Sequence, residues 1–377
     1  MVKCGIVGLP NVGKSTLFNA LLKKRVALSA NYPFATVEPN IGVVAVPDER
    51  LEKLGELVAA EKSTPGESGP TPGVSQRPPI VSAVTEFVDI AGLVKGASTG
   101  EGLGNKFLSH IREVDAIIHV LRDFGDIGVI REGSVNPQED KLTVETELAL
   151  ADLQVVEKLV SGQEKQAKVT KDVLEVEKLE ILQKSKGLLE KGGIREIRDI
   201  GGIGDKKIRE WFKTLPLLSI KPVLYVYNVS EEDLRFKIED LRLEEDKMAI
   251  SAKIEEEMAD LSEDERKEYL KEIGIKETGL ERLIKKAYHL LGLISFLTAG
   301  KKEVRAWTLR AGENALRASG VIHTDFMKNF IRAEVIEYEK LVEVGSYVAA
   351  KSKGLIRTEG KDYIVKDGDV IEFLIGS

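Results

Sequence analysis

Residues 8–16 read G-L-P-N-V-G-K-S-T, and this stretch constrains the fold more than any other. It matches the pattern G-x-x-x-x-G-K-[ST], with an apolar strand pattern ending in Ile6 and Val7 before it and the helical run L-F-N-A-L-L after it. In such a loop the glycines let backbone N–H groups converge on phosphate oxygens, and the helix that follows presents its positive end. The sequence therefore predicts a nucleoside triphosphate site at the start of an α/β domain.

The phosphate site is expected to draw on this loop and on two later segments. The loop residues expected to bind nucleotide are Asn11, Val12, Gly13, Lys14, Ser15 and Thr16. Lys14 would bridge the β- and γ-phosphates, and the Ser15 hydroxyl would bind Mg²⁺, the one cofactor predicted. Thr36, in N-Y-P-F-A-T-V-E-P-N, would reach the metal and sense the γ-phosphate. Asp89, at the end of the strand pattern T-E-F-V-D, would hold the metal's water shell, and Gly92 would give its N–H to the γ-phosphate.

The residue after Gly92 is Leu93, where small GTPases place the glutamine that orients the attacking water. A leucine side chain neither donates nor accepts a hydrogen bond, so we expect slow intrinsic turnover. His119, in the strand pattern A-I-I-H-V-L, is the candidate that would position the water. The alternative is a core histidine with a satisfied hydrogen bond, because strand periodicity alone does not fix which face His119 occupies.

The base-binding segment is V-L-Y-V-Y-N-V-S-E at residues 223–231, where a G protein carries N-K-x-D. The aspartate of that motif accepts two hydrogen bonds from guanine, whereas adenine offers an acceptor at N1. Glu231 stands in its place, and Val229, which can pack on a purine face and donate its N–H to adenine N1, replaces the lysine. Asn228 can serve the N7 edge of either purine. The other side of the base would be closed by Ser251, Ala252 and Lys253. ATP is therefore predicted to bind better than GTP, although the Glu231 carboxylate leaves guanine pairing open.

Alternating β-branched runs and helical patterns predict a doubly wound, mainly parallel α/β nucleotide-binding domain, which carries the P-loop, from residues 1–141 and 215–293. Residues 63–79, rich in Gly and Pro, are predicted to form an exposed loop. Residues 142–214 carry Glu/Lys/Leu-rich helices with two narrow apolar stripes, which favour a projecting helical hairpin over two helices packed on the sheet. The stripes contain Leu148, Ala151, Val155 and Leu159, then Val169, Val173, Val176, Leu179 and Leu182, with a turn expected at S-G-Q, residues 161–163.

Residues 294–377 are predicted to form a small α+β domain, with strands at E-V-R-A-W-T-L, K-D-Y-I-V and D-V-I-E-F-L. The net charge of −7 argues against wholesale coating of nucleic acid, although a local basic face can still meet RNA. The single cysteine, Cys4, excludes an internal disulfide. No run of 18 apolar residues or cleavable signal is found, so we expect a cytoplasmic protein that uses no membrane. We also expect a monomer.

Several segments together resemble the YchF / Obg-like ATPase family over essentially the whole chain. They are N-Y-P-F-A-T-V-E-P-N, F-V-D-I-A-G-L-V-K-G-A-S-T-G-E-G-L-G-N-K-F-L, R-A-W-T-L-R-A-G and V-I-H-T-D-F. The resemblance implies a P-loop G-domain of the OBG type, a coiled-coil insertion, a TGS-like, β-grasp-like C-terminal domain and association with ribosomes. The Gly/Pro loop at residues 63–79 departs from the family's shorter connection, so no function is carried over to it.

Two functions remain at this stage. The first is a slow, Mg²⁺-dependent ATPase switch that binds the ribosome or its large subunit through the hairpin and the TGS-like domain, with rRNA contact open. The second is a GTP-binding regulatory module that gates a protein partner and in which hydrolysis is incidental. A metabolic kinase is disfavoured, because no acceptor-substrate signature is found.

Overall fold

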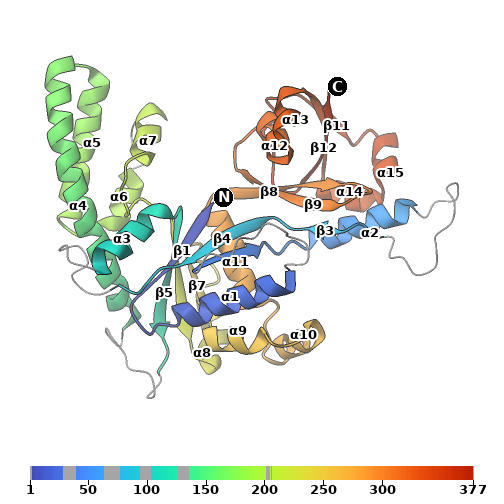
Figure 1. The fold of residues 1–377 in the computed structure, drawn as a ribbon, viewed down its shortest axis with the longest axis horizontal. Helices are drawn as coiled ribbons and strands as arrows, with labels where there is room; N and C mark the ends of the chain where they lie inside the picture. Colours follow the sequence, from blue (N-terminus) through green and yellow to red (C-terminus); the bar gives the residue numbers. More distant parts are fainter. Residues whose placement is uncertain are drawn as a thin grey trace. The chain divides into compact units, whose positions relative to one another are not determined.

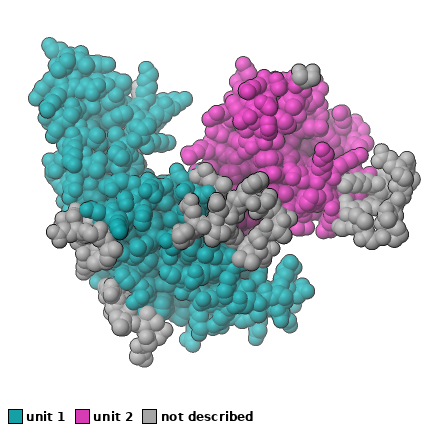
Figure 2. All heavy atoms as spheres, viewed as in Figure 1, with its two compact units in different colours: residues 1–27, 36–43, 86–290 teal, residues 28–35, 44–85, 291–377 magenta. Residues whose placement is uncertain are grey.

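The computed structural model describes residues 2–28, 40–62, 77–93, 103–125, 136–200, 204 and 206–376. The chain divides into two compact units, coloured separately in Figure 2: residues 1–27, 36–43 and 86–290 form unit 1, and residues 28–35, 44–85 and 291–377 form unit 2. Thr36 and most of the Gly/Pro loop, residues 63–76, lie outside the described residues. None of the helices in the described ranges combines the length and the hydropathy that crossing a membrane requires.

Unit 1 is built on a six-stranded sheet in the order β2-β4-β1-β5-β6-β7. Its strands are β1 (Lys3–Val7), β2 (Ile41–Ala45), β4 (Val84–Asp89), β5 (Ala116–Asp123), β6 (Val223–Val229) and β7 (Lys247–Ile250). The pairs β1–β4, β1–β5, β5–β6 and β6–β7 are parallel, as the continuous apolar runs predict. From β1 the chain builds β2 and β4 on one side and β5 to β7 on the other. The carboxyl end of β1 is therefore a topological switch point, where open α/β sheets bind ligands.

The longest helices of unit 1 are α4 and α5, which form the predicted hairpin (Figure 1). The helices of unit 1 are α1 (Lys14–Leu28), α3 (Leu103–Glu113), α4 (Pro137–Thr170), α5 (Val173–Leu189), α6 (Ile194–Ile200), α7 (Lys206–Lys213), α8 (Glu231–Asp240), α9 (Ala252–Met258), α10 (Glu263–Glu272) and α11 (Gly279–Leu290). The first half of α4 contacts β5, and its second half runs alongside α5 away from the sheet. The insertion is thus attached to the sheet through one end of α4.

The turn predicted at residues 161–163 is wrong, because α4 continues to Thr170. The Ser161 hydroxyl donates back to the Glu157 carbonyl at 3.0 Å, inside the helix. The chain turns instead at Lys171, which has a left-handed φ of 50°, and Asp172 caps α5 by accepting from the Leu174 N–H at 3.0 Å. An aspartate N-cap outweighs a single glycine in a Glu/Lys-rich helix. Helix α4 also begins at Pro137, five residues before the predicted boundary of the insertion.

Polar contacts fix α4 to the sheet. Asp152 is fully buried and accepts hydrogen bonds from the Leu218 N–H at 2.8 Å and from the Ser219 N–H at 2.7 Å. Burial raises the pKa of Asp152, and these hydrogen bonds oppose the rise. Nearer the start of α4, the Tyr225 hydroxyl donates to Glu145. The base of the hairpin therefore rests on β6, the strand that ends in the predicted base-binding segment.

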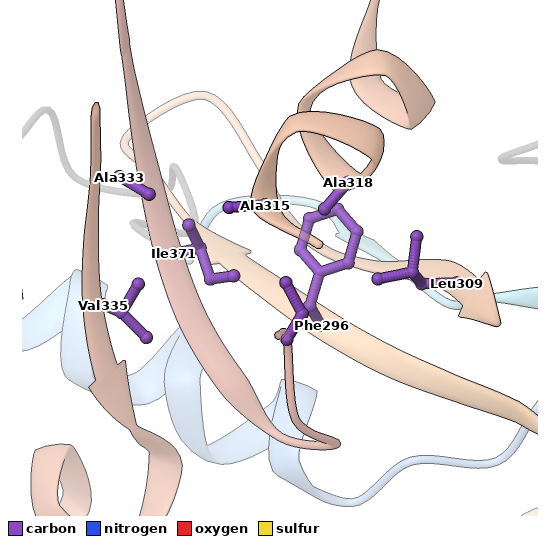
Figure 3. Close-up of a cluster of buried hydrophobic side chains, with 8 residues drawn as sticks. Phe296, Leu309, Ala315, Ala318, Ala333, Val335 and Ile371 are labelled. Carbon is purple, nitrogen blue, oxygen red and sulfur yellow. The ribbon is translucent and has the colours of Figure 1, made fainter. Parts of the chain in front are cut away.

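Unit 2 is a second mixed sheet, in the order β11-β10-β12-β8-β9-β3. Its strands are β3 (Ile80–Val81), β8 (Leu293–Ala299), β9 (Val304–Arg310), β10 (Phe330–Glu337), β11 (Arg357–Glu359) and β12 (Asp369–Ile375), and its helices are α2 (Arg50–Lys62), α12 (Ala315–Ile322), α13 (Thr324–Lys328), α14 (Tyr338–Val344) and α15 (Tyr347–Ser352). Figure 3 shows its core, where Ala315 and Ala318 of α12 face Phe296 and Ile371 of the sheet. The segment K-D-Y-I-V is not a strand: Ile364 makes only an isolated bridge to Asn314.

Residues 44–85, which the sequence division placed in the nucleotide-binding domain, group with the C-terminal residues. Ile80 and Val81 of β3 pair in parallel with β9, and Arg50 of α2 forms an ion pair with Asp367 at 2.7 Å. These contacts join residues more than 200 positions apart in the sequence, and local patterns carry no signal for such pairing.

Candidate functional site

The loop between β1 and α1 has the backbone conformation that its glycines allow. Gly8 and Gly13 have φ of +154° and +96°, and Asn11 has a left-handed φ of 58°. A Cβ atom on Gly13 would lie 2.3 Å from Nδ2 of Asn228, so only glycine fits there. The loop is thus held between its own strand and helix and the end of β6.

Three predicted phosphate and metal residues meet beside this loop. Lys14 is buried at 7% exposure and donates to the Leu9 carbonyl at 2.7 Å. The Ser15 hydroxyl lies 3.4 Å from Oδ2 of Asp89, at the end of β4. Burial lowers the pKa of Lys14 and raises the pKa of Asp89, and each charge partly offsets the shift of the other. A buried cation beside a half-buried carboxylate is a polar site set in a surrounding of lowered dielectric constant.

Gly92 lies against the Lys14 ammonium. A Cβ atom at position 92 would be 3.1 Å from Nζ of Lys14 and 3.3 Å from the backbone nitrogen of Pro10, so a side chain there would crowd the loop. Leu93 is buried at 1% exposure, and its N–H donates to the Gly8 carbonyl at 3.3 Å. The Leu93 side chain therefore belongs to the core. Residues 94–102, which follow it, are outside the described part of the chain.

His119 lies in the interior of the sheet. It is buried at 2% exposure on β5, between Val7 of β1 and Tyr225 of β6, and its ring centroid is 5.8 Å from that of Tyr225. Among the described residues, no partner reaches its Nε2. Burial and the nearby Lys141 and Lys14 charges lower the pKa of His119 to about 3, so the imidazole is neutral. The location agrees with the core reading, but the unpartnered nitrogen does not fit a histidine whose hydrogen bonds are all satisfied.

Asn228 joins the two sides of the base-binding end. Its Nδ2 donates to the Val12 carbonyl at 2.9 Å, and its Oδ1 accepts from the Ala252 N–H at 2.9 Å. The amide therefore connects the phosphate loop to the S-A-K segment, and the second N–H of Nδ2 remains for a ligand. A pocket of about 510 Å³ opens beside it. The pocket is lined by Asn11, Gly13, Thr16, Phe124, Gly125, Asn228, Val229, Ser230, Glu231, Ser251, Ala252, Lys253 and Glu256.

Val229 and Glu231, two of the predicted base-binding residues, have side chains that contact other parts of the protein. Val229 lines the pocket, but at 3% exposure it is buried at the end of β6, so its side chain has little surface to cover a base. Glu231 is exposed in the first turn of α8, and its Oε1 accepts from the Tyr269 hydroxyl of α10 at 3.2 Å. Burial first, and the Glu231 charge second, raise the pKa of Tyr269, so the phenol stays protonated and donates.

Comparison with known proteins identifies the family. The family model YchF-GTPase_C, described as "Protein of unknown function (DUF933)", matches residues 293–376, and the model MMR_HSR1, "50S ribosome-binding GTPase", matches residues 3–158. The chain is 47% identical to "Ribosome-binding ATPase YchF" of Bacillus subtilis, over 98% of both chains, and 44% identical to the protein of that name from Escherichia coli O157:H7, over 99% of this chain and 98% of the relative. The chain belongs to the YchF family. The resemblance inferred from the sequence motifs is thereby confirmed.

A solved YchF structure also matches the fold. The YchF GTPase of Schizosaccharomyces pombe superposes with a TM-score of 0.81 at 37% identity, covering 99% of this chain and 97% of that one. The predicted fold class, a P-loop α/β domain with a small C-terminal domain, is confirmed. YchF relatives named as ATPases make this chain a member of a family of NTP-hydrolysing enzymes.

Sequence reasoning missed two aromatic residues at the candidate base end of the site. Phe124 lines the pocket directly after β5, and the Arg122 guanidinium lies 4.5 Å from the centre of its ring. Its position at the carboxyl end of a parallel strand is a signal that was present in the sequence. Tyr269 comes 38 residues after Glu231 on another helix, and nothing local connects the two.

Proposed function

We propose that this YchF family member is a Mg²⁺-dependent nucleoside triphosphatase that prefers ATP to GTP and acts as a slow nucleotide switch on the ribosome or its large subunit. The observation that carries the proposal is the meeting of Lys14, Ser15 and Asp89 beside a glycine-shaped loop. Such a group binds a triphosphate and its metal and has no other evident use. The names of the relatives support both the ATPase activity and the ribosome as partner.

The residues present fit a magnesium ion. Oδ1 of Asp89 is buried without a hydrogen-bond partner among the described residues, next to the Ser15 hydroxyl. In the described part of the chain, no group of three His, Cys, Asp or Glu side chains is placed to hold a metal alone. That finding agrees with magnesium, which takes few protein ligands and completes its shell with water and phosphate. Ser15, Asp89 and Thr36 would hold the ion, which would neutralise charge on the phosphates.

The chain's own groups account for binding and for slow turnover. Lys14 exchanges its hydrogen bond from the Leu9 carbonyl to the phosphates, and the N–H groups of residues 11–16 surround them. Leu93 supplies no polar group for the attacking water. We assign that role to His119, whose neutral imidazole can exchange a hydrogen bond with water through Nε2 once the ring is exposed to the γ-phosphate. Exposing a buried ring costs free energy, and this cost makes turnover slow until a partner supplies it.

The proposed preference for adenine over guanine depends on which hydrogen-bonding groups of the pocket already have partners within the protein. Reading guanine takes two carboxylate oxygens, one for N1–H and one for N2–H. Oε1 of Glu231 is engaged by Tyr269, so the carboxylate is turned toward α10. Asn228 keeps one N–H for N7, which both purines share. Phe124 offers a ring on which either base can stack. Adenine can therefore make the N7 hydrogen bond and the stacking contact in this pocket. Guanine can make them too, but it lacks the carboxylate oxygens that usually accept from its N1–H and N2–H groups.

The decisive experiment titrates ATP and GTP side by side and follows ribosome pelleting in the presence of ATP and of ADP. We expect tighter ATP binding and an association with ribosomes that differs between the two nucleotides. The competing function is a GTP-binding module gating a protein partner, and the description "50S ribosome-binding GTPase" of the matched model favours testing it. Equal or tighter GTP binding would favour that module. Ribosome binding in turn implies a cytoplasmic protein, and we expect the free chain to sediment as a monomer.

A further inference from the structure

The first half of α4 is bonded to β6 through side chains that stand two helical turns apart. Nε2 of Gln138 donates to the Tyr227 hydroxyl at 2.9 Å, and Glu145 accepts from the Tyr225 hydroxyl. Asp152, which anchors α4 to the backbone ahead of β6, follows after seven more residues. Because seven residues make almost two turns, these three side chains lie on one face of α4. Helix α4 is therefore held on the sheet by polar contacts at three defined places.

Tyr225 makes the middle contact, and its ring lies beside His119. The two residues are paired across β5 and β6, and their ring centroids are 5.8 Å apart. Lys141, one turn before Glu145 on α4, places its Nζ 4.1 Å from the centre of the Tyr225 ring and 3.9 Å from the Glu145 carboxylate. Burial, and after it the bond to Glu145, raise the pKa of Tyr225, so the phenol stays protonated and donates. Two side chains of α4 thus fix the ring that packs against His119.

Tyr227 makes the same kind of contact without touching the histidine. It lies two positions after Tyr225 on β6, so both side chains point to the same face of the sheet. Across the strands, however, Tyr227 is paired with Leu121. The two tyrosines therefore separate what α4 does for packing from what it does for His119.

Attachment of α4 does not require ionised groups beside Tyr225. Asp152 already binds α4 to two backbone N–H groups, and the apolar Leu148 is buried. The side chains of Lys141 and Glu145 are only 18% and 21% exposed, and ionised groups covered to this extent lose hydration that an apolar side chain would not lose. A hydroxyl that donates to a carboxylate is, in return, strong and directional. The contact is therefore suited to fixing the orientation of the Tyr225 ring.

The His119 imidazole has a reason to leave its buried place. Among the described residues no partner reaches its Nε2, and a ring nitrogen in contact with water would gain a hydrogen bond. The ring is neutral, because burial and the charges of Lys141, Lys14 and Arg198 all disfavour its protonated form. No electrostatic attraction to these groups holds it in place. Packing against neighbours such as Tyr225 must do so.

We propose that Tyr225 is a positioning residue for His119. Held from α4 by Glu145, the Tyr225 ring keeps the imidazole in its buried place, and the start of the hairpin thereby sets the rate of hydrolysis. The inference rests on the proposed role of His119 toward the attacking water. It makes α4 the regulatory element of that site, since a shift of α4 on β6 would break the contact that fixes the ring.

The first test compares two single-atom substitutions on one strand. Tyr225→Phe keeps the ring and removes the hydroxyl that Glu145 holds. Single-turnover hydrolysis of ATP by the full chain should rise about tenfold, the scale of one hydrogen bond to a charged group, with ATP affinity within about twofold of the wild type. Tyr227→Phe, the matched control, removes a hydroxyl bonded to the same helix and should leave hydrolysis unchanged. Thermal melts check that both variants are folded. Equal rises in both variants would mean a loosened α4 and would overturn the inference.

The partner of Tyr225 on α4 gives a second variant at a half-buried position. Glu145→Gln keeps the shape of the side chain and removes its charge, so hydrolysis should rise in the same direction, about threefold. Combined with Tyr225→Phe it should add nothing, because both substitutions weaken one contact. Additive rises would contradict a restraint that passes from Glu145 through Tyr225.

The accessibility of the ring can be measured without any turnover. Diethyl pyrocarbonate acylates exposed imidazoles, and mass spectrometry locates the product. His119 should react about tenfold faster in Tyr225→Phe than in the wild type or in Tyr227→Phe. His110, exposed on α3, is the internal reference and should react at one rate in all three proteins. An unchanged rate at His119 would overturn the inference.

A His119→Ala background separates the inference from the proposed function. There Tyr225→Phe should no longer raise hydrolysis. A rise that persists would show that Tyr225 acts through another group, and the inference would fail while the proposed function stands. If His119→Ala is slow but Tyr225→Phe hydrolyses ATP as the wild type does, the inference again fails alone. If His119→Ala itself hydrolyses ATP at the wild-type rate, the proposed role of His119 fails together with the inference.

Discussion

The phosphate end and the base end of the site differ in what holds them. At the phosphate end, the Lys14 charge is buried and the Asp89 carboxylate is half-buried, beside a loop whose conformation requires its glycines. At the base end, an open pocket of about 510 Å³ is bounded by side chains already bonded to other parts of the protein. Asn228 bonds to two backbone segments, and Glu231 bonds to Tyr269.

This difference separates affinity from selectivity. Buried charge directed at phosphate is worth much free energy and is the same for every nucleoside triphosphate. Hydrogen bonds to the base are worth less each, and they are decided by which donors and acceptors remain unengaged. Substitutions at the phosphate end should therefore remove function for both nucleotides, and substitutions at the base end should change the ratio between them.

The largest effect is expected for Lys14→Ala. Removing the buried ammonium should lower turnover about a thousandfold for ATP and GTP alike, the scale seen when a preorganised charge-stabilising group is lost. Phosphate-release assays with both nucleotides measure it. Lys23→Ala is the control, because Lys23 lies on the same helix but pairs with Asp260 at the surface. Turnover that survives in Lys14→Ala would remove the loop from the reaction.

His119→Ala tests whether the core position also serves chemistry. We expect ATP affinity within a few-fold of the wild type and turnover about a hundredfold lower, the usual scale for a positioned acid, base or water ligand. Single-turnover hydrolysis and nucleotide titration separate the two quantities. A loss of binding in proportion to a loss of thermal stability would instead favour a purely structural histidine.

The pH dependence of the folded chain's stability tests independently whether the His119 imidazole is buried. Its pKa is about 3 in the folded chain and near the ordinary 6.5 when unfolded. The unfolded state therefore binds the proton more readily, and the folded chain should lose stability as pH falls from about 6.5 toward 3. Denaturant titrations of wild type and His119→Gln should diverge in that window. Parallel pH curves would mean that the imidazole is not buried in solution.

The two ends also differ in how far the sequence predicted them. At the phosphate end, Lys14, Ser15 and Asp89 come together as predicted, because they belong to one contiguous loop or, like Asp89, end a strand. The base end was predicted in position only. Tyr269 and the two partners of Asn228 come from separate elements, and tertiary hydrogen bonds leave no local pattern.

The fold was likewise predicted well where the signal is local and poorly where it depends on tertiary contacts. Strands and helices with strong periodicity were predicted correctly, including β5, β6 and β12. The hairpin turn was misplaced because S-G-Q lies inside α4, and the chain turns instead just before Asp172, whose side chain caps α5. Residues 44–85 were assigned to the wrong unit, because the pairing of β3 with β9 depends on the whole chain.

Rebuilding the guanine-binding motif N-K-x-D should change the ratio of GTP affinity to ATP affinity rather than the affinity for both nucleotides. Val229→Lys with Glu231→Asp restores N-K-x-D and should raise GTP affinity relative to ATP about tenfold, about 1.4 kcal/mol. Fluorescent-nucleotide competition measures the ratio. Asn228→Ala is the contrasting variant and should weaken both nucleotides, since it removes the N7 contact and the link between Val12 and Ala252. A ratio unmoved by the double variant would place base choice outside this segment.

The smallest and most specific effect is expected for Tyr269→Phe. This substitution keeps the ring and removes only the hydroxyl that holds Oε1 of Glu231, so the carboxylate is released toward the base. GTP affinity should then rise about threefold relative to ATP, within the range of one hydrogen bond of about 0.5–1.5 kcal/mol.

The background variant Glu231→Gln supplies the control for Tyr269→Phe. With no carboxylate to release, Tyr269→Phe should have no further effect on the ratio, and the double-mutant cycle isolates the coupling between the two side chains. Equal changes in the affinities for both nucleotides would show that Tyr269 shapes the pocket and does not direct Glu231. A coupled change in the ratio alone would mean that base selectivity is set by a helix outside the motif, through the orientation of a carboxylate that the sequence retains.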